Sequence, residues 1–113
     1  MVKKMKISDL IQTGEFKQVT DLNLEKTLEG IYCGDLLSWV MSHAKEGEAW
    51  ITVQTHINVI AVASLLNLAC IIIPENIEVE ADTIEKATSE EIPILATSLN
   101  AYGIFKKVYE LGM

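Results

Sequence analysis

The chain has 113 residues, half of them hydrophobic but only 6% aromatic, so one domain with a core of aliphatic side chains is expected. The formal net charge is −7, and all nine basic residues are lysines. Proteins that bind nucleic acid or anionic membranes need a basic surface. The only basic clusters are Lys3, Lys4 and Lys6 near the start and Lys106 and Lys107 near the end. Nucleic acid and membrane are therefore not expected as partners.

The first third of the chain predicts a short helix and two strands. Residues 7–12 form the helix, which Gly14 ends, and residues 16–20 form a short strand. Residues 21–28 are expected to be a loop. Residues 30–33 form a second strand, and a helix over residues 36–44 follows with Asp35 as its N-cap. The apolar stripe of this helix consists of Leu36, Leu37, Val40, Met41 and Ala44.

The middle of the chain is strongly apolar. Residues 49–54 predict a third strand, and Thr55 is expected to cap a helix over residues 56–68. That helix is apolar on nearly every side, so we expect it to be covered by the sheet and by a second element. Residues 70–73 are an unbroken apolar run that ends at Pro74, which is typical of a central strand in a parallel sheet.

The last third predicts a charged helix over residues 82–91, a strand over residues 93–96 and a final helix that ends near Leu111. Thr97 or Ser98 is expected to cap the final helix. Its predicted buried residues are Leu99, Tyr102, Phe105, Val108 and Tyr109. From residue 30 onward, strands and helices alternate. This alternation predicts an α/β fold with three α/β/α layers and a mostly parallel sheet of four to five strands.

Several motifs of known chemistry are absent from the sequence. There is no phosphate-binding P-loop, no glycine-rich dinucleotide fingerprint and no nucleophile elbow. His43 and His56 belong to different helices without a Cys/His cluster, so we expect no metal site and no cofactor. Cys33 and Cys70 are predicted to be buried free thiols of a protein in the reducing cytoplasm. Asp35 with His56 remains the one conceivable acid/base pair, and the chain is not expected to be an enzyme.

The candidate binding site is the edge of the sheet at the carboxyl ends of its parallel strands. Loops and helix N-termini converge at that edge, so ligands commonly bind there. Each residue also has a structural role open to it, either capping a helix or forming a solvated turn. Glu75, Asn76 and Asn100 lie at the same strand ends. The predicted ligand-binding residues are Gly34, Asp35, Gln54, Thr55, His56, Asn58, Thr97 and Ser98.

Two segments carry a resemblance to a known family. Residues 30–41 (GIYCGDLLSWVM) and residues 50–58 (WITVQTHIN) resemble the DRTGG domain family. These domains are similar to the N-terminal domain of HPr kinase/phosphorylase, and they also occur in CBS-domain pyrophosphatases and phosphate acetyltransferases. The resemblance extends from about residue 6 to residue 111, and it implies a single α/β/α domain over residues 1–113. The acidic and basic pair of the motif that names the family is missing from residues 54–58, and the kinase domain is absent.

The resemblance implies a non-catalytic regulatory or ligand-sensing module, often dimeric. Similar stand-alone domains occur in anaerobic bacteria beside hydrogenase and redox genes, which implies a metabolic or redox context. The expected partners are a second copy of the chain and a small metabolite or nucleotide. The alternative is an assembly domain that dimerises or binds a partner protein without any small-molecule ligand. The all-round apolar helix over residues 56–68 motivates this alternative, because a second subunit could cover the side that the sheet leaves free.

Overall fold

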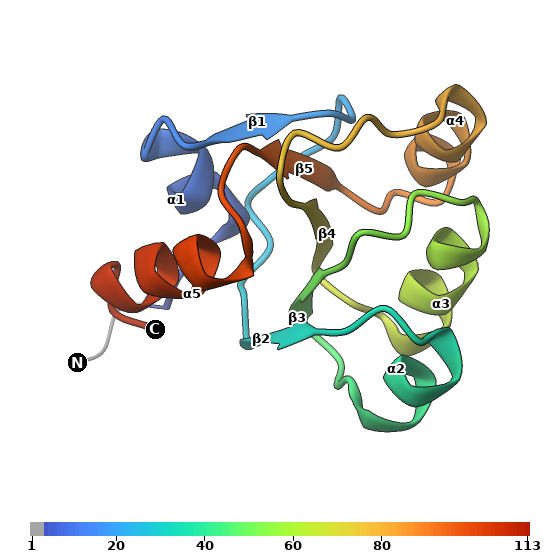
Figure 1. The fold of residues 1–113 in the computed structure, drawn as a ribbon, viewed down its shortest axis with the longest axis horizontal. Helices are drawn as coiled ribbons and strands as arrows, with labels where there is room; N and C mark the ends of the chain where they lie inside the picture. The colour runs from blue at the N-terminus through green and yellow to red at the C-terminus, as the bar shows by residue number, and fades with distance from the viewer. Residues whose placement is uncertain (1–3) are drawn as a thin grey trace.

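The computed structural model describes residues 4–113, so Lys3 of the N-terminal basic cluster lies outside the described residues. The alternation of strands and helices predicted from residue 30 onward is confirmed, with most ends shifted by one or two residues (Figure 1). In chain order, the elements are α1 (Ile7–Gln12), β1 (Phe16–Gln18), β2 (Gly30–Cys33), α2 (Leu37–His43), β3 (Glu48–Ile51), α3 (Asn58–Leu66), β4 (Cys70–Ile73), α4 (Ala81–Ser89), β5 (Ile94–Thr97) and α5 (Ala101–Glu110).

The five strands form one sheet in the order β1-β5-β4-β3-β2. Strands β2 to β5 are parallel, and β1 is antiparallel to β5, with Phe16 opposite Thr97. The predicted fold class, a mostly parallel α/β sheet of up to five strands, is confirmed. All four residues of β4 are buried, as expected for a central strand that is covered on both faces.

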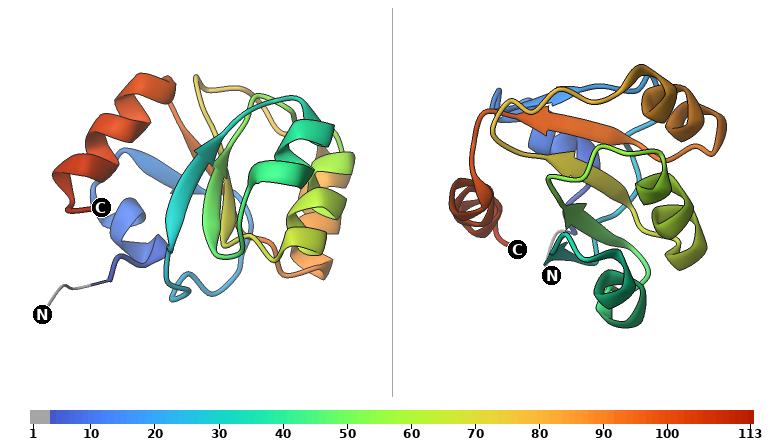
Figure 2. Two further views of the ribbon diagram at one scale, coloured as in Figure 1. Left: turned by 90° about the horizontal axis from the view of Figure 1, so that it is seen from below. Right: turned by 45° about the vertical axis from the view of Figure 1, so that its right-hand side comes forward.

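Helices cover both faces of the sheet, which gives three layers (Figure 2). Helices α1 and α5 lie on one face, where Ile7, Leu10 and Ile104 pack in a cluster with sheet residues such as Ile72. Helices α2, α3 and α4 lie on the other face. Their core cluster includes Val40, Ile60 and Ala87, with Trp50 and Ile71 from the sheet.

Helix α3 is covered on more than one side, as its composition predicted. It lies on the sheet between α2 and α4 and contacts both of them (Figure 2). Val59, Ile60, Val62 and Ala63 are buried. The sheet and the neighbouring helices of the same chain cover these four residues, whereas Leu65 on the outer side stays 70% exposed.

Three predictions of burial are wrong in α5. Tyr102, Phe105 and Tyr109 are exposed, whereas Ile104 and Val108 face the sheet. The helix carries two apolar stripes of similar spacing, and the aliphatic one matches the flat aliphatic face of the sheet. The three aromatic side chains therefore form an outward stripe at helical spacing.

The smaller α2 and the edge strand β2 also bury less than predicted. Leu36 and Met41 are exposed, because α2 lies at the end of its layer and has only α3 as a helical neighbour. Cys33 is exposed too, because it ends the edge strand β2, whereas Cys70 in central β4 is buried as predicted. The prediction of two buried thiols is therefore correct for Cys70 and wrong for Cys33.

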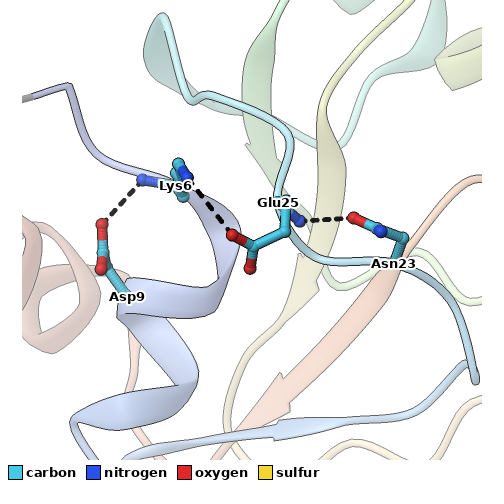
Figure 3. Close-up of polar contacts among 4 residues, drawn as sticks. All are labelled: Lys6, Asp9, Asn23 and Glu25. Carbon is cyan, nitrogen blue, oxygen red and sulfur yellow. Dashed lines mark hydrogen bonds and ion pairs between the residues drawn. The ribbon is translucent and has the colours of Figure 1, made fainter.

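A set of polar contacts fixes the start of α1 against the loop that precedes β2 (Figure 3). The backbone N–H of Lys6 donates to the Asp9 carboxylate over 2.8 Å. The Lys6 ammonium group lies 3.3 Å from Glu25, whose own N–H donates to the Asn23 side chain. These contacts fix the start of α1 to the loop, while buried Ile7 and Leu10 hold the helix on the sheet.

Candidate functional site

The carboxyl ends of β2, β3, β4 and β5 share one edge of the sheet because these four strands are parallel. We call the loops that leave this edge the strand-end rim, comprising residues 34–36, 52–58, 74–80 and 98–100. All eight predicted ligand-binding residues belong to these loops or, for Thr97, to the last position of β5. Helices α2, α3 and α5 begin within three residues of the rim loops.

Asp35 ties the end of β2 to the end of β3. Its carboxylate accepts hydrogen bonds from the Thr52 hydroxyl at 2.7 Å and from the Val53 N–H at 2.9 Å. The side-chain amide of Gln54 donates through Nε2 to the Asp35 carbonyl at 3.1 Å. The indole of buried Trp50 donates to the Gly34 carbonyl at 2.8 Å. The predicted role of Asp35 as the cap of α2 is wrong, because Leu36 is the N-cap and no side chain caps this helix.

The loop from β3 to α3 carries three more predicted residues. The Thr55 carbonyl accepts from the Thr83 hydroxyl of α4 at 2.7 Å, so this loop is fixed to the start of α4. Thr55 does not cap α3, whose N-cap is Ile57 without a side-chain bond. The Asn58 N–H donates to Nδ1 of the exposed His56 at 3.2 Å. Neutral His56 therefore carries its proton on Nε2, which is left to donate outward.

The other half of the rim follows β4 and β5. The Thr97 side chain is buried, donates to the Glu15 carbonyl and accepts from the Leu99 N–H, so its hydroxyl is fully used within the fold. Asn100, not Thr97 or Ser98, caps α5 by accepting from the Gly103 N–H. Ser98 is exposed.

Backbone bonds close the turn after β4. Glu75 and Asn76 both have positive φ angles, 59° and 57°, and their N–H groups donate to the carbonyls of Leu99 and Thr97. The turn after β4 is thereby held against the loop after β5. Two consecutive left-handed residues are uncommon outside glycine, and here paired backbone bonds offset their cost.

The structure brings the predicted residues together in two groups. In the first group, the Gln54 side chain is hydrogen-bonded to the Asp35 carbonyl, and Gly34 precedes Asp35 in the chain and accepts from Trp50. The second group is Thr97, the last residue of β5, and Ser98, which follows it. Strand β5 is separated from β2 by β4 and β3, about 14 Å at the usual strand spacing. A small ligand could reach one group at a time. Thr52, which the sequence analysis did not single out, is the buried residue that joins the first group, and its only signal was a hydroxyl at the end of an apolar run.

The rim is acidic. His56 is its only side chain that can become a cation, whereas Asp35, Glu75, Glu78 and Glu80 are carboxylates. The Cys33 thiol at the end of β2 is partly desolvated, which raises its pKa, and the negative charge of Asp35 raises it further. A thiol with a raised pKa is a poor nucleophile at neutral pH.

Within residues 4–113, no group of three or more His, Cys, Asp or Glu side chains is arranged to hold a metal ion. Over the same residues, no helix has both the length and the apolar character needed to cross a membrane.

A cavity of about 540 Å³ lies at the opposite edge of the sheet, near the amino end of β2. It is bounded by α1, by the residues that precede β2 and by the residues that follow α5. A second, more apolar cavity of about 320 Å³ lies between the edge strand β2 and α5, and Met113 lines both.

The fold is similar to that of a solved regulatory region. It is described as the CBS and DRTGG domains of the regulatory region of Clostridium perfringens pyrophosphatase, complexed with the activator diadenosine tetraphosphate. The TM-score is 0.73 at 14% sequence identity, over 88% of this chain and 44% of the solved chain. The chain has the fold of a DRTGG-containing regulatory region. The resemblance noted in the sequence is therefore confirmed at the level of the fold.

The chain spans less than half of that regulatory region. No protein-family model matches the sequence, and no curated protein matches it. The fold is therefore the property that the two proteins share, and side chains of this chain must carry any further argument.

Proposed function

We propose that the chain is a regulatory module without catalytic activity that senses a small metabolite at the first group of the strand-end rim. The observation that supports this most is the fold, which is shared with a regulatory region rather than with a catalytic domain. The rim adds support because the Asp35 network holds polar groups in fixed positions at the edge where open α/β sheets bind ligands.

The charge of the rim limits the class of ligand. Phosphate groups are usually bound by arginine or lysine, or by helix N-termini. The rim loops contain neither lysine nor arginine, and four carboxylates are present. Helices α2, α3 and α5 begin at the rim and offer N-terminal N–H groups, but the four carboxylates oppose a ligand with several negative charges. We therefore expect a neutral or cationic metabolite, such as a nucleoside, in preference to a nucleotide with several phosphates.

Thermal shift with a matched series tests this proposal, because a ligand that binds only the folded state raises the melting temperature. The series is adenosine, AMP, ATP and diadenosine tetraphosphate, together with a library of uncharged and cationic metabolites. A hit that is lost in Gln54→Ala and kept in Ser98→Ala would support the first group as the site. Stabilisation that increases with phosphate number would contradict the charge argument, and a flat result across the library would overturn ligand sensing.

The second candidate function is assembly through a homodimer or a partner protein. The aromatic stripe on α5 favours it, because Tyr102 and Tyr109 are 75% and 78% exposed and Phe105 is 41% exposed on the same helix. Large exposed aromatic side chains are enriched at protein interfaces. Sedimentation velocity at micromolar concentration tests this candidate. A dimer that Tyr102→Lys converts to monomer would support it, and a monomeric parent protein would remove the homodimer.

A further inference from the structure

The 540 Å³ cavity at the amino end of β2 has the size of a small-molecule site, and it is separate from the strand-end rim. Its floor contains Met5 and Leu28, which are buried members of the core. Leu111 and Met113, which follow α5, form an apolar wall that is partly open to solvent. An apolar group of moderate size would therefore lose water where it contacts the floor and this wall.

The polar side of the cavity comes from one face of α1. Asp9, Gln12 and Thr13 all line it, and their spacing of three and four residues places them along the same side of the helix. The Thr13 hydroxyl is used within the fold, because it donates to the Leu10 carbonyl and accepts from the Glu15 N–H. Asp9 and Gln12 remain as the groups on this face that can orient a ligand.

The fixed charges around the cavity favour a cation. Asp9 and Glu29 are carboxylates, and among residues 4–113 the lining has one cationic side chain, Lys4. Lys4 lies 3.6 Å from Glu29, so its charge is offset by that partner. One oxygen of Asp9 accepts the Lys6 N–H at the start of α1, and its charge is not neutralised by that neutral donor (Figure 3).

The backbone reinforces this preference. Leu111 and Gly112, which follow the last turn of the ten-residue α5, line the cavity. The C-terminal end of a helix carries partial negative charge from its aligned peptide dipoles. In α5 the carbonyls of Lys107 and Tyr109 already accept the N–H groups of Leu111 and Gly112, so this contribution is small. This end still adds to the field of Asp9 instead of opposing it.

We propose that this cavity binds a small organic amine whose apolar body rests on Met5 and Leu28 and whose ammonium group faces Asp9. The cavity is independent of the strand-end rim, so this proposal does not rest on the proposed metabolite site. An anion of the same shape is excluded by the same charges, and a neutral analogue keeps only the apolar contacts.

A titration followed by ¹⁵N–¹H correlation spectra tests this proposal with three probes of one shape: tryptamine, 3-(2-hydroxyethyl)indole and indole-3-propionate. We expect tryptamine to shift the amide signals of residues 9–13, 28–29 and 111–113. The neutral alcohol should bind about fivefold more weakly, as an ion pair near the surface contributes about 1 kcal/mol. Indole-3-propionate should bind more weakly still.

Variants separate the charge from the fold. Asp9→Asn keeps an acceptor for the Lys6 N–H, so α1 remains capped, and it should abolish the advantage of the amine over the alcohol. Asp82→Asn, in the first turn of α4, is the matched control and should leave that advantage intact. Equal binding of the amine and the carboxylate, shifts outside the cavity, or no binding at millimolar concentration would overturn the proposal. Gln54→Ala should leave tryptamine binding unchanged while affecting a rim ligand, so the two proposals can fail separately.

Discussion

Replacement of Asp35 by alanine tests whether this carboxylate joins two strand ends or caps a helix. In the structure it accepts the Thr52 hydroxyl and the Val53 N–H and makes no capping bond to α2. Thr52 is only 1% exposed, so its hydroxyl would lose a partner that water cannot easily replace. An unsatisfied buried group costs about 1–3 kcal/mol.

The total cost follows from the exposure of each group. Val53 is 44% exposed, so water can restore most of what its N–H loses. We therefore expect Asp35→Ala to lower the free energy of unfolding by about 2 kcal/mol, most of it from Thr52. For a domain of this size, that loss lowers the melting temperature by roughly 8 °C. Asp35→Asn keeps a neutral acceptor and should cost about half as much.

Urea unfolding of a Trp39→Phe background provides the assay, because the fluorescence then reports buried Trp50, whose indole donates to Gly34 beside the mutated residue. A double-mutant cycle with Thr52→Val isolates the pair, and we expect a coupling energy of about 1 kcal/mol. Zero coupling, together with a loss of helical circular dichroism, would indicate that Asp35 acts on α2 instead. An alanine variant within 0.5 kcal/mol of the parent would refute the reasoning.

Three further predictions concern thiols and turns. In native protein, Ellman's reagent should modify the accessible Cys33 slowly at pH 7, because partial desolvation of its thiol and the nearby Asp35 charge raise its pKa. The reagent should reach buried Cys70 only after unfolding. Burial raises the pKa of Cys70 to about 12, above its ordinary value of 9.0. Below pH 9 the thiol is protonated in both the folded and the unfolded state, so the free energy of unfolding should not depend on it there. That free energy should then fall by about 1.4 kcal/mol per pH unit between those values as the unfolded thiol ionises, and Cys70→Ala should flatten this alkaline slope in pH-dependent urea unfolding. Gly14 and Gly47 share a φ of +82°, but a Cβ at Gly47 would lie 2.6 Å from a Glu29 carbon, whereas Gly14 has open space. Thermal unfolding should show that Gly47→Ala destabilises more than the cost of about 1 kcal/mol expected for Gly14→Ala, and equal losses would contradict this.

The sequence predicted the layered sheet because its strongest signals were local. The run over residues 70–73 is short, apolar at every position and ended by Pro74, which is typical of a strand covered on both faces, and β4 lies there. The alternation of short apolar runs with helical stretches then left few arrangements for the parallel strands. The antiparallel pairing of β1 with β5 is different, because it depends on contacts between residues about 80 positions apart.

The wrong predictions concern patterns that fit two structures equally well when only neighbouring residues are considered. In α5, the stripe through Tyr102, Phe105 and Tyr109 has helical spacing, and so does the stripe through Ile104 and Val108. Periodicity shows that one side is buried, but the shape of the facing sheet selects which. The same limit applied to Asp35, because a residue before a helix is a natural cap until a neighbouring strand offers it better donors.

The candidate ligand sites were limited for a related reason. The parallel order of the strands placed all the predicted residues at one edge. It did not reveal that the hydroxyl of buried Thr97 donates a hydrogen bond to the Glu15 carbonyl. Nor could it reveal the cavity at the other edge, which is lined by α1, by the residues that precede β2 and by the residues that follow α5. Sites built from distant segments leave no spacing signature in the chain.

The charge of the rim limits which ligands this chain is expected to bind there. The pyrophosphatase regulatory region was solved with diadenosine tetraphosphate, an activator with several negative charges. Ligands with several phosphates are usually bound by cationic side chains together with helix N-termini, and His56 is the one side chain of the rim loops that can become a cation. A sheet edge sets where loops meet, whereas the loop side chains decide what they bind. Because these loops carry four carboxylates, any ligand of this rim must be attracted by hydrogen bonds, apolar contact or positive charge.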